Sequence, residues 1–368
     1  MNTFLRNAAL SAFVLLSASA FGQQYNQVNL VANTSGAAPT TDASLVNPWG
    51  LSRGSSTPWW VSDNATGVST LYNGPGAKQS LTVTIPAAKS GATGSPTGTI
   101  FNGSKTDFLL TPTTPALFLF STLDGLIVGW NPTTGPMTVA MTKNGAYTGL
   151  TSAMINGKQR LYAANFAQGR VDVYDNAFHP VPRTFGAFED RWLPWGYVPF
   201  NVQAVGNDIV VTYALRQGDN PRETDGPGLG FVDIYSATGA LLQRLEHGDW
   251  LNAPWGVALA PLDFGAFSHD LLIAQFAGGG TSESSGYIAA YDLATGHFKG
   301  LLQDTSGTPL AINGIWAISP GNASPANFDP AGAPSGELYF TAGPNHGTGG
   351  LFGYLTAVSA DLIRGNAQ

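Results

Sequence analysis

The sequence predicts an all-β protein, and within that class a six-bladed β-propeller. Short runs rich in β-branched and aromatic residues recur along the chain, each bounded by Gly, Asn, Asp or Pro. The 46 Gly and 24 Pro supply many turns, and 9 Trp, 12 Tyr and 20 Phe favour strands. After residue 24, no segment shows a sustained helical period, so these runs indicate many short strands.

A repeated unit predicts which fold of the all-β class the chain adopts. Each copy is an apolar strand, a Gly-containing loop and a second strand that ends on an aromatic residue, as from Trp59 to Tyr72. The six closing aromatic residues are Tyr72, Trp130, Tyr174, Tyr235, Tyr291 and Tyr354. Their spacing lies at or above the roughly 40–50 residues of a propeller blade, as expected if some loops carry insertions. Six copies predict six four-stranded blades; a many-stranded β-sandwich is the alternative.

A further element precedes several of these units and is expected to be the innermost strand of a blade. It reads Asn47-Pro48-Trp49-Gly50-Leu51, then Ala253-Pro254-Trp255-Gly256-Val257, then Asn313-Gly314-Ile315-Trp316-Ala317, with looser copies at 147–151 and 200–203. Gly in such a strand allows close approach near the axis. The segment Tyr25–Ala32 alternates in polarity, so we expect it to add the outer strand of the last blade and to cover an edge.

The N-terminus has the pattern of a secretory signal peptide over residues 1–20. Arg6 precedes the apolar and small-residue run Ala8–Ala20, which ends in Ala18-Ser19-Ala20. That run is too short to span a bilayer, and a buried N-terminal helix is the alternative. We therefore expect a secreted or periplasmic protein whose residues 21–368 form one propeller domain with no transmembrane segment.

Composition limits the partners. The chain has no Cys, which removes disulfides and thiolate metal sites. Only 11% of the residues are charged and the net charge is -7, so there is no basic stripe for nucleic acid. The partner classes that remain are a small molecule, a carbohydrate or another protein.

The motifs resemble a family whose activity is not known. Asn47-Pro48-Trp49-Gly50-Leu51 followed by Trp59-Trp60-Val61-Ser62-Asp63-Asn64 looks like an uncharacterised family of secreted bacterial propellers, some with a C-terminal PEP-CTERM sorting tail. The resemblance covers nearly all of the mature chain, but no such tail follows Tyr354. More distantly the units resemble NHL-type propellers, which include calcium-dependent lactonases and lyases as well as binding modules. The resemblance implies fold and export, and no activity.

Four Asn side chains are predicted to meet at one mouth of the channel, because each begins an inner strand: Asn47, Asn201, Asn252 and Asn313. With Asp63 at the end of the neighbouring strand, amide and carboxylate oxygens suit Ca²⁺, and Asp63, Asn201 and Asn252 are the candidate metal ligands. No cofactor follows from the sequence beyond this possible Ca²⁺. The competing interpretation is that each Asn caps its own turn.

Three Trp follow those Asn residues: Trp49, Trp255 and Trp316. They are either an aromatic platform for a sugar or packing residues between blades, and large aromatics favour packing. The polar segments 189–195 and 216–223 flank the fourth unit and are either a lid with an acid or base or ordinary solvated loops.

Nothing in the sequence specifies catalysis. There is no Gly-x-Ser-x-Gly nucleophile elbow, and no two His have the spacing of a helical zinc motif. We expect His346, which follows a strand end, to be a lone surface residue. The favoured function is an exported binding or scaffold module. The alternative is a calcium-dependent hydrolase or lyase that acts on a lactone or carbohydrate at the channel mouth.

Overall fold

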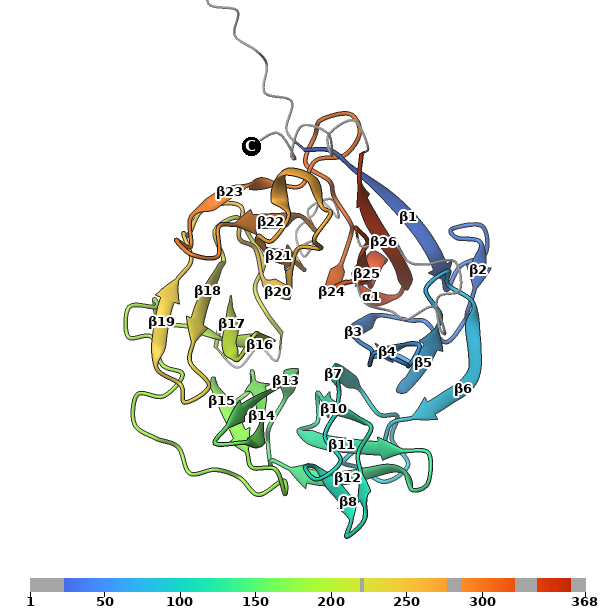
Figure 1. The fold of residues 1–368 in the computed structure, drawn as a ribbon, viewed down its shortest axis with the longest axis vertical. Helices are drawn as coiled ribbons and strands as arrows, with labels where there is room; N and C mark the ends of the chain where they lie inside the picture. Colours follow the sequence, from blue (N-terminus) through green and yellow to red (C-terminus); the bar gives the residue numbers. More distant parts are fainter. Residues whose placement is uncertain (1–22, 219–221, 277–285, 322–335, 359–368) are drawn as a thin grey trace, which may run out of the picture.

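The computed structural model describes residues 23–218, 222–276, 286–321 and 336–358, so the predicted signal peptide lies outside the described residues. Six β-sheets surround one axis, and the strands nearest that axis are β3, β7, β13, β16, β20 and β24 (Figure 1). The prediction of a six-bladed propeller is confirmed.

Blades one and two follow the chain from the inside outward. Blade one holds β3 (Pro48–Ser52), β4 (Trp59–Asp63), β5 (Val68–Tyr72) and β6 (Lys78–Thr84). Blade two holds β7 (Pro96–Phe101), β10 (Phe118–Thr122), β11 (Leu126–Asn131) and β12 (Gly135–Met141), with the small hairpin β8 (Leu109–Thr111) and β9 (Thr114–Pro115) inserted.

Blades three to five continue the ring. Blade three holds β13 (Tyr147–Ile155), β14 (Lys158–Asn165) and β15 (Arg170–Tyr174). Blade four holds β16 (Tyr197–Val205), β17 (Asp208–Leu215), β18 (Gly230–Tyr235) and β19 (Leu241–Arg244). Blade five holds β20 (Pro254–Leu259), β21 (Leu271–Gln275), β22 (Ile288–Tyr291) and β23 (Phe298–Leu301), with the 3-10 turn Gly265–Phe267.

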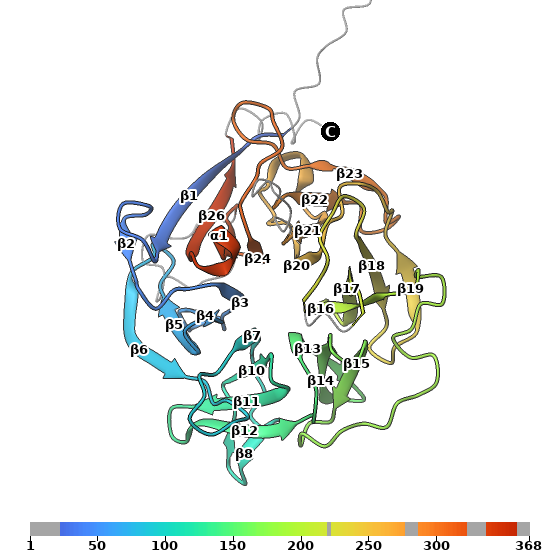
Figure 2. The same cartoon turned by 180° about the vertical axis from the view of Figure 1, so that it is seen from behind.

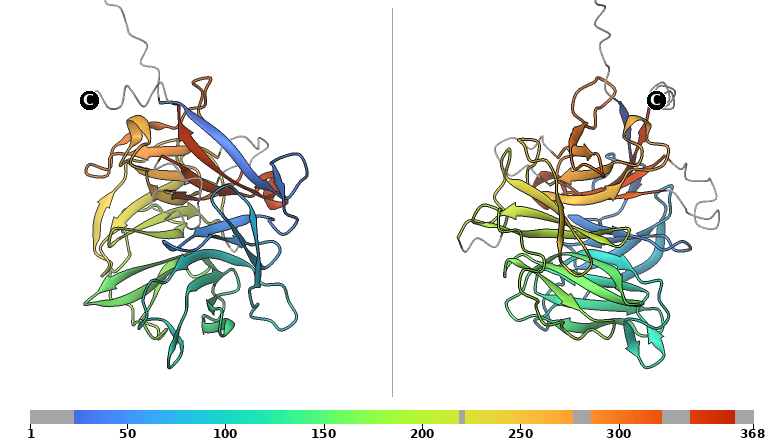
Figure 3. Two further views of the ribbon diagram at one scale, coloured as in Figure 1. Left: turned by 45° about the vertical axis from the view of Figure 1, so that its right-hand side comes forward. Right: turned by 60° about the vertical axis from the view of Figure 1, so that its left-hand side comes forward.

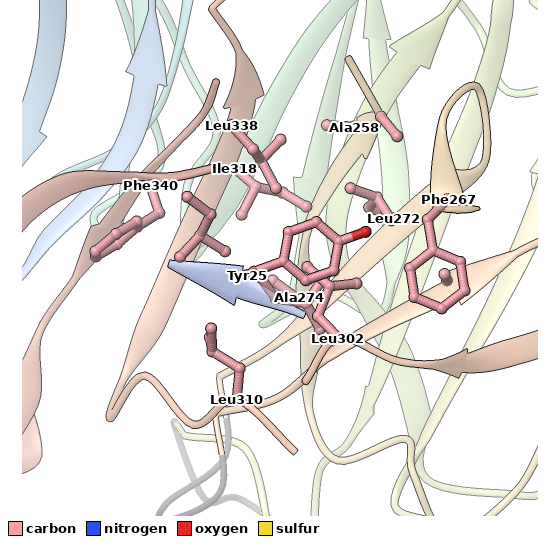
Figure 4. Close-up of a cluster of buried hydrophobic side chains, with 14 of the residues drawn as sticks. Tyr25, Ala258, Phe267, Leu272, Ala274, Leu302, Leu310, Ile318, Leu338 and Phe340 are labelled. Atoms are coloured by element: carbon pink, nitrogen blue, oxygen red, sulfur yellow. The ribbon is translucent and has the colours of Figure 1, made fainter. Parts of the chain in front are cut away.

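Blade six is completed by the N-terminal strand, as predicted. It holds β24 (Ile315–Pro320), β25 (Leu338–Ala342) and β26 (Leu351–Ala357); β1 (Tyr25–Ala32) pairs antiparallel with β26, and β2 (Thr40–Thr41) lies outside it. Figures 2 and 3 show the blue β1 alongside the red β26, so the two ends of the ring meet in one sheet. Tyr25 anchors β1 in a core that it shares with blade five (Figure 4).

Two details differ from the prediction. Blade three has three strands instead of four, because the chain after β15 contacts it only through a bridge between Tyr174 and Pro180. Tyr354 does not hold the place of the other closing aromatics. Those five face the start of the preceding apolar run, at Trp59, Phe118, Leu161, Ile209 and Leu271. In blade six Leu355 pairs with Leu338, so Tyr354 is one position out of phase and partly exposed.

Glycines let the inner strands approach one another. A Cβ on Gly50 would lie 2.4 Å from the Thr97 carbonyl oxygen, and one on Gly98 would lie 2.4 Å from the Leu150 nitrogen. Side chains are therefore excluded where blades one, two and three meet near the axis. Because the inner strands are this close, residues from opposite blades reach each other across the axis.

Candidate functional site

Four aromatic side chains fill one end of the axis and are called the aromatic plug here: Trp49, Phe200, Trp255 and Trp316. Each lies where its inner strand shifts register against the next strand, and such bulges re-aim a side chain. The Trp49 and Trp316 rings stack at 3.6 Å between centroids, and Trp49 reaches Phe200 of blade four at 6.5 Å. Contact between blades one and four closes the channel at this end.

Hydrogen bonds hold the plug to its neighbours. Trp316 Nε1 donates to the Asn47 side-chain oxygen at 3.0 Å, and Trp255 Nε1 donates to the Thr148 carbonyl at 2.8 Å. The three Trp are 4%, 4% and 1% exposed, so none presents a ring face to solvent. This placement agrees with the packing interpretation of these residues, because a sugar platform requires an exposed face.

A polar cavity of about 230 Å³, called the axial mouth here, lies over the plug. Its lining is Arg222, Glu223, Asp225, Phe276, Asn313, Gly314, Gly343 and His346. Phe276 stacks on Trp316 at 4.0 Å, which places the cavity directly above the indole rings. The residues come from the β17–β18 loop of blade four and from the ends of β21, β24 and β25.

The axial mouth concentrates charge in a chain that has little of it. Burial raises the pKa of the Glu223 carboxyl, and the nearby Asp225 acts in the same direction, whereas a backbone hydrogen bond and Arg222 act against it. A carboxyl that keeps its proton to higher pH can donate a hydrogen bond to a ligand as well as accept one.

The turn that carries His346 has an unusual backbone. Asn345 and His346 both have φ of 55°, in the left-handed region that residues other than glycine rarely enter. Gly347 follows at φ 78°, so three successive residues are left-handed. Such conformations cost on the order of 1–3 kcal/mol each and often occur at ligand sites. This turn places His346 in the lining of the cavity.

Of the four Asn predicted to meet, only Asn313 lines the axial mouth. Asn47 is 8% exposed and accepts the Trp316 indole hydrogen bond. Asn201 is 3% exposed and its amide donates to the Trp255 carbonyl at 2.6 Å. The Asn252 oxygen accepts a hydrogen bond from the Gly226 nitrogen at 2.8 Å, which fixes the blade-four loop.

Asp63 lies inside blade one. It is fully buried, and its carboxylate accepts bonds from the Thr70 nitrogen at 3.0 Å and hydroxyl at 2.7 Å. Burial raises the pKa of the Asp63 carboxyl well above its usual range, despite those bonds from Thr70. Asp63 is not among the residues that line the axial mouth.

The three predicted metal ligands therefore do not fit one calcium cage. Asp63 is bonded to Thr70, the Asn252 oxygen is used by Gly226, and the Asn201 side chain packs tightly over Gly149. In the described part of the chain, no group of three or more His, Asp or Glu residues is arranged to hold a metal ion. Calcium binding at the axial mouth stays a prediction.

Sequence reasoning singled out only part of the site. Segment 216–223 was expected to provide a lid with an acid or base, and its Arg222 and Glu223 do line the cavity. Asp225 lies just beyond that segment, and His346 was expected to be a lone surface residue. The available signal for His346 was its position directly after a strand end, which in a propeller faces an axial mouth.

The opposite end of the axis has a different character. A cavity of about 480 Å³ is lined there by the far ends of β3, β7, β16, β20 and β24. Its lining is small or apolar apart from a few polar residues, and Arg53 is its single charged residue. The Arg53 guanidinium lies 4.6 Å from the Trp59 ring centroid and donates to the Gly321 carbonyl at 2.6 Å.

Comparison with known proteins identifies no family. No protein-family model matches the chain. An uncharacterized protein of Acanthamoeba polyphaga mimivirus is 28% identical over 337 residues, which is 89% of this chain and 78% of that protein. A second uncharacterized mimivirus protein is 27% identical over 338 residues, 89% of this chain and 84% of its own length.

The similar solved structures include proteins of different functions. The aldose sugar dehydrogenase of Streptomyces coelicolor, solved with PQQ, has a TM-score of 0.49 at 13% identity and covers 91% of this chain and 99% of its own. A streptogramin B lyase has a TM-score of 0.46 at 10% identity, with 91% of this chain and 97% of its own covered.

No helix among the described residues is long and apolar enough to cross a membrane.

Proposed function

We propose that the protein is an exported binding module that holds a small polar ligand at the axial mouth. The cavity carries the proposal: Arg222, Glu223, Asp225 and His346 converge above an aromatic floor, in a chain with 11% charged residues. Convergent polar groups in a concave site above apolar residues are typical of small-molecule recognition.

The size and lining of the cavity indicate the class of ligand. At about 230 Å³ it is smaller than the 300–1,000 Å³ of typical drug-sized sites, which suits one sugar ring or a hydroxylated molecule of that size. Such a molecule can place a C–H face toward Phe276 and its hydroxyls toward Glu223, Asn313 and His346.

Export and family membership are part of this proposal. The signal-peptide pattern of residues 1–20 supports secretion or a periplasmic location, and the motifs around Trp49 and Trp59 support kinship with secreted bacterial propellers. Mass spectrometry of exported material tests the first point, because an intact Met1 on protein recovered outside the cytoplasm contradicts it.

The binding experiment uses the mature chain and a panel of neutral hexoses, hexuronates and hexonolactones. A ligand that binds only the folded state raises stability by about 2.7 kcal/mol at a hundredfold excess over Kd, so one class should raise the Tm by several degrees. In Glu223→Gln, at least ten times more ligand should be needed to produce the same shift in Tm. Glu246→Gln, a substitution at an exposed position, is the control and should leave the shift unchanged. A panel without any shift contradicts the proposal.

One observation favours the alternative of a hydrolase or lyase. The Glu223 carboxyl, whose pKa is raised by burial, lines the same cavity as the His346 imidazole, and a carboxyl and an imidazole in one cavity are a suitable acid and base pair. In that case one member of the panel is converted, conversion is lost in Glu223→Gln, and melting curves differ between calcium and chelator. If the melting curves with calcium and with chelator are identical and no compound is converted, the enzyme alternative is rejected and the binding module remains.

A further inference from the structure

Blade three leaves its third strand open on the outside. In every other blade the third strand is paired on both sides, by β6, β12, β19, β23 or β1, whereas β15 pairs in the described structure with β14 alone. The chain after β15 folds back on the end of that strand through two backbone bonds: the Val181 nitrogen donates to the Val173 carbonyl at 2.8 Å, and the Asp175 nitrogen donates to the His179 carbonyl at 2.9 Å. The residues on both sides of Val181 are Pro, and Pro cannot extend a ladder because it lacks an N–H.

The direction of the free backbone groups follows from the first of these hydrogen bonds. The Val173 carbonyl points away from β14, because it accepts from Val181 on the other side. Backbone direction alternates along a strand, so the N–H and C=O of Val171 also point outward, while those of Asp172 point toward β14. The outer edge of β15 therefore presents the N–H and C=O of Val171 and the N–H of Val173 to an added antiparallel strand.

A groove of about 390 Å³ runs along this edge. Its lining includes Val171 and Val173, which belong to the face toward blade four, and Tyr174, which packs with the opposite face. A lining drawn from both faces of one strand shows that the groove follows the strand edge. In Figure 1 the chain from β15 to β16 runs as a long loop on the outer rim.

The groove is cationic although the protein carries a net charge of -7. Arg160, Arg170 and Arg183 line it, and Asp172 is the one acidic residue of its lining. Arg170 pairs with Asp172 at 2.5 Å and Arg183 with Glu189 at 3.0 Å. Among the described residues Arg160 forms no ion pair, so its charge is available to an incoming carboxylate.

Exposed aromatic side chains lie on the loop that follows the groove. Phe185, Trp192 and Trp195 are 88%, 83% and 91% exposed. The loop is held to blade four where Arg244 donates two hydrogen bonds to Asp190, at 2.6 and 2.7 Å. Exposed Trp and Phe beside Arg are typical of protein–protein contacts, and an anchored loop presents them without a large ordering cost.

We infer that this rim is a docking site for an extended, acidic segment of another protein, which binds along β15 as the missing fourth strand of blade three. Backbone hydrogen bonds to the N–H and C=O of Val171 and to the N–H of Val173 supply the pairing, because the Val173 carbonyl already accepts from Val181. Arg160 selects a carboxylate, and Phe185 and the two Trp extend the contact beyond the strand. A small ligand would not use the linear edge, and a basic segment would be repelled by the unpaired charge of Arg160.

The test is a selection of random dodecapeptides displayed on phage against the immobilised mature protein, followed by affinity measurement for the enriched peptides. We expect peptides in which β-forming residues alternate with Glu or Asp. Val171→Pro should weaken their binding at least tenfold, because it removes an outward N–H, and Arg160→Glu should weaken it at least fivefold. Lys89→Glu, the same charge change at an exposed distant loop, should leave binding unchanged.

Hydrogen exchange on the unaltered protein gives a readout that does not depend on any variant folding. The amides of Val171 and Val173 should exchange more slowly when the selected peptide is bound, and those of the paired strand β26 should not change. The inference is overturned if no peptide is enriched, if enriched peptides are basic, if Val171→Pro binds them as well as the unaltered protein, or if protection appears at the axial mouth instead.

Discussion

Blades six and three differ in what lies outside their third strand. In blade six, β1 pairs with β26 from Tyr25–Ala357 to Ala32–Leu351. In blade three, the chain turns away from β15 after a single bridge, between Tyr174 and Pro180. Both third strands arise from the same repeated unit, so the difference lies in the segment available to cover the edge: β1 alternates in polarity, whereas residues 175–196 contain Pro180, Pro182 and Pro194. A covered edge closes the ring, and an open edge is available for recognition.

The largest loss of stability is expected where β1 closes the ring. Tyr25 is 1% exposed, its ring lies 4.4 Å from that of Phe264, and its hydroxyl donates to the Phe264 carbonyl at 2.9 Å. Replacing a buried aromatic with Ala costs about 3–5 kcal/mol, so Tyr25→Ala should lower the free energy of unfolding by that amount. Chemical denaturation measures it, with the exposed Gln27→Ala on the same strand as control. A loss below about 1 kcal/mol would show that β1 does not hold the ring closed.

The second effect is electrostatic and lies where β2 meets blade one. Asp42 is buried, and although burial acts to raise the pKa of its carboxyl, hydrogen bonds from Lys78, Tyr72 and the Ser44 backbone outweigh burial and lower it. A lowered folded-state pKa means stability that is present above the unfolded value and is lost as pH falls through the folded value.

Asp42→Asn should therefore lower the free energy of unfolding at pH 7 by about 2–3 kcal/mol, the value of hydrogen bonds to a charged group. The deficit should begin to shrink below about pH 4, where the carboxyl of the unfolded chain is protonated, and should disappear below the lowered folded-state pKa. Denaturation at pH 7, 5 and 3 measures the difference. Lys299→Met, which removes the Lys299–Asp270 pair of blade five at 2.7 Å, is the control for loss of an ion pair elsewhere. A deficit that is the same at all three pH values contradicts the assignment.

The sequence predicted the fold because the repeat is carried by residues whose role is local. Gly at turns, aromatics at strand ends and the alternation of Tyr25–Ala32 each act within a few residues, and six copies place them in a ring. The inner strand Pro96–Phe101 was missed because it has neither the Asn nor the Trp of its counterparts. The absent fourth strand of blade three was also missed, although Pro180 and Pro182 were a usable signal.

The site was less predictable because side-chain direction depends on bulges. Register shifts at Trp49, Phe200 and Trp255 turn these side chains toward the axis and leave the Asn residues next to them bonded to backbone or indole groups. Asp63 faces Thr70 because it keeps the alternation of β4. The charged residues of the axial mouth come from loops whose paths no local pattern fixes.

The last prediction compares the third strands directly and has the smallest expected effect. Val171 in β15 and Phe352 in β26 are equivalent, since they pair with Ala164 and Thr341, each one residue before the end of the second strand. Phe352 also pairs with Val31 on its other side. A Pro at Phe352 removes an N–H that belongs to a ladder on either side, whereas a Pro at Val171 removes one that faces the open edge.

Each Pro variant is compared with Ala at the same position, so that the loss of the side chain cancels. Phe352→Pro should be less stable than Phe352→Ala by about 2 kcal/mol, from a lost hydrogen bond and an unsatisfied carbonyl. Val171→Pro should differ from Val171→Ala by less than about 1 kcal/mol, because an edge strand tolerates Pro where its N–H faces outward. Denaturant midpoints of the four variants measure both differences. Equal losses at the two positions would mean that the Val171 N–H is already paired in the isolated protein, and the edge would then offer no place for a further strand.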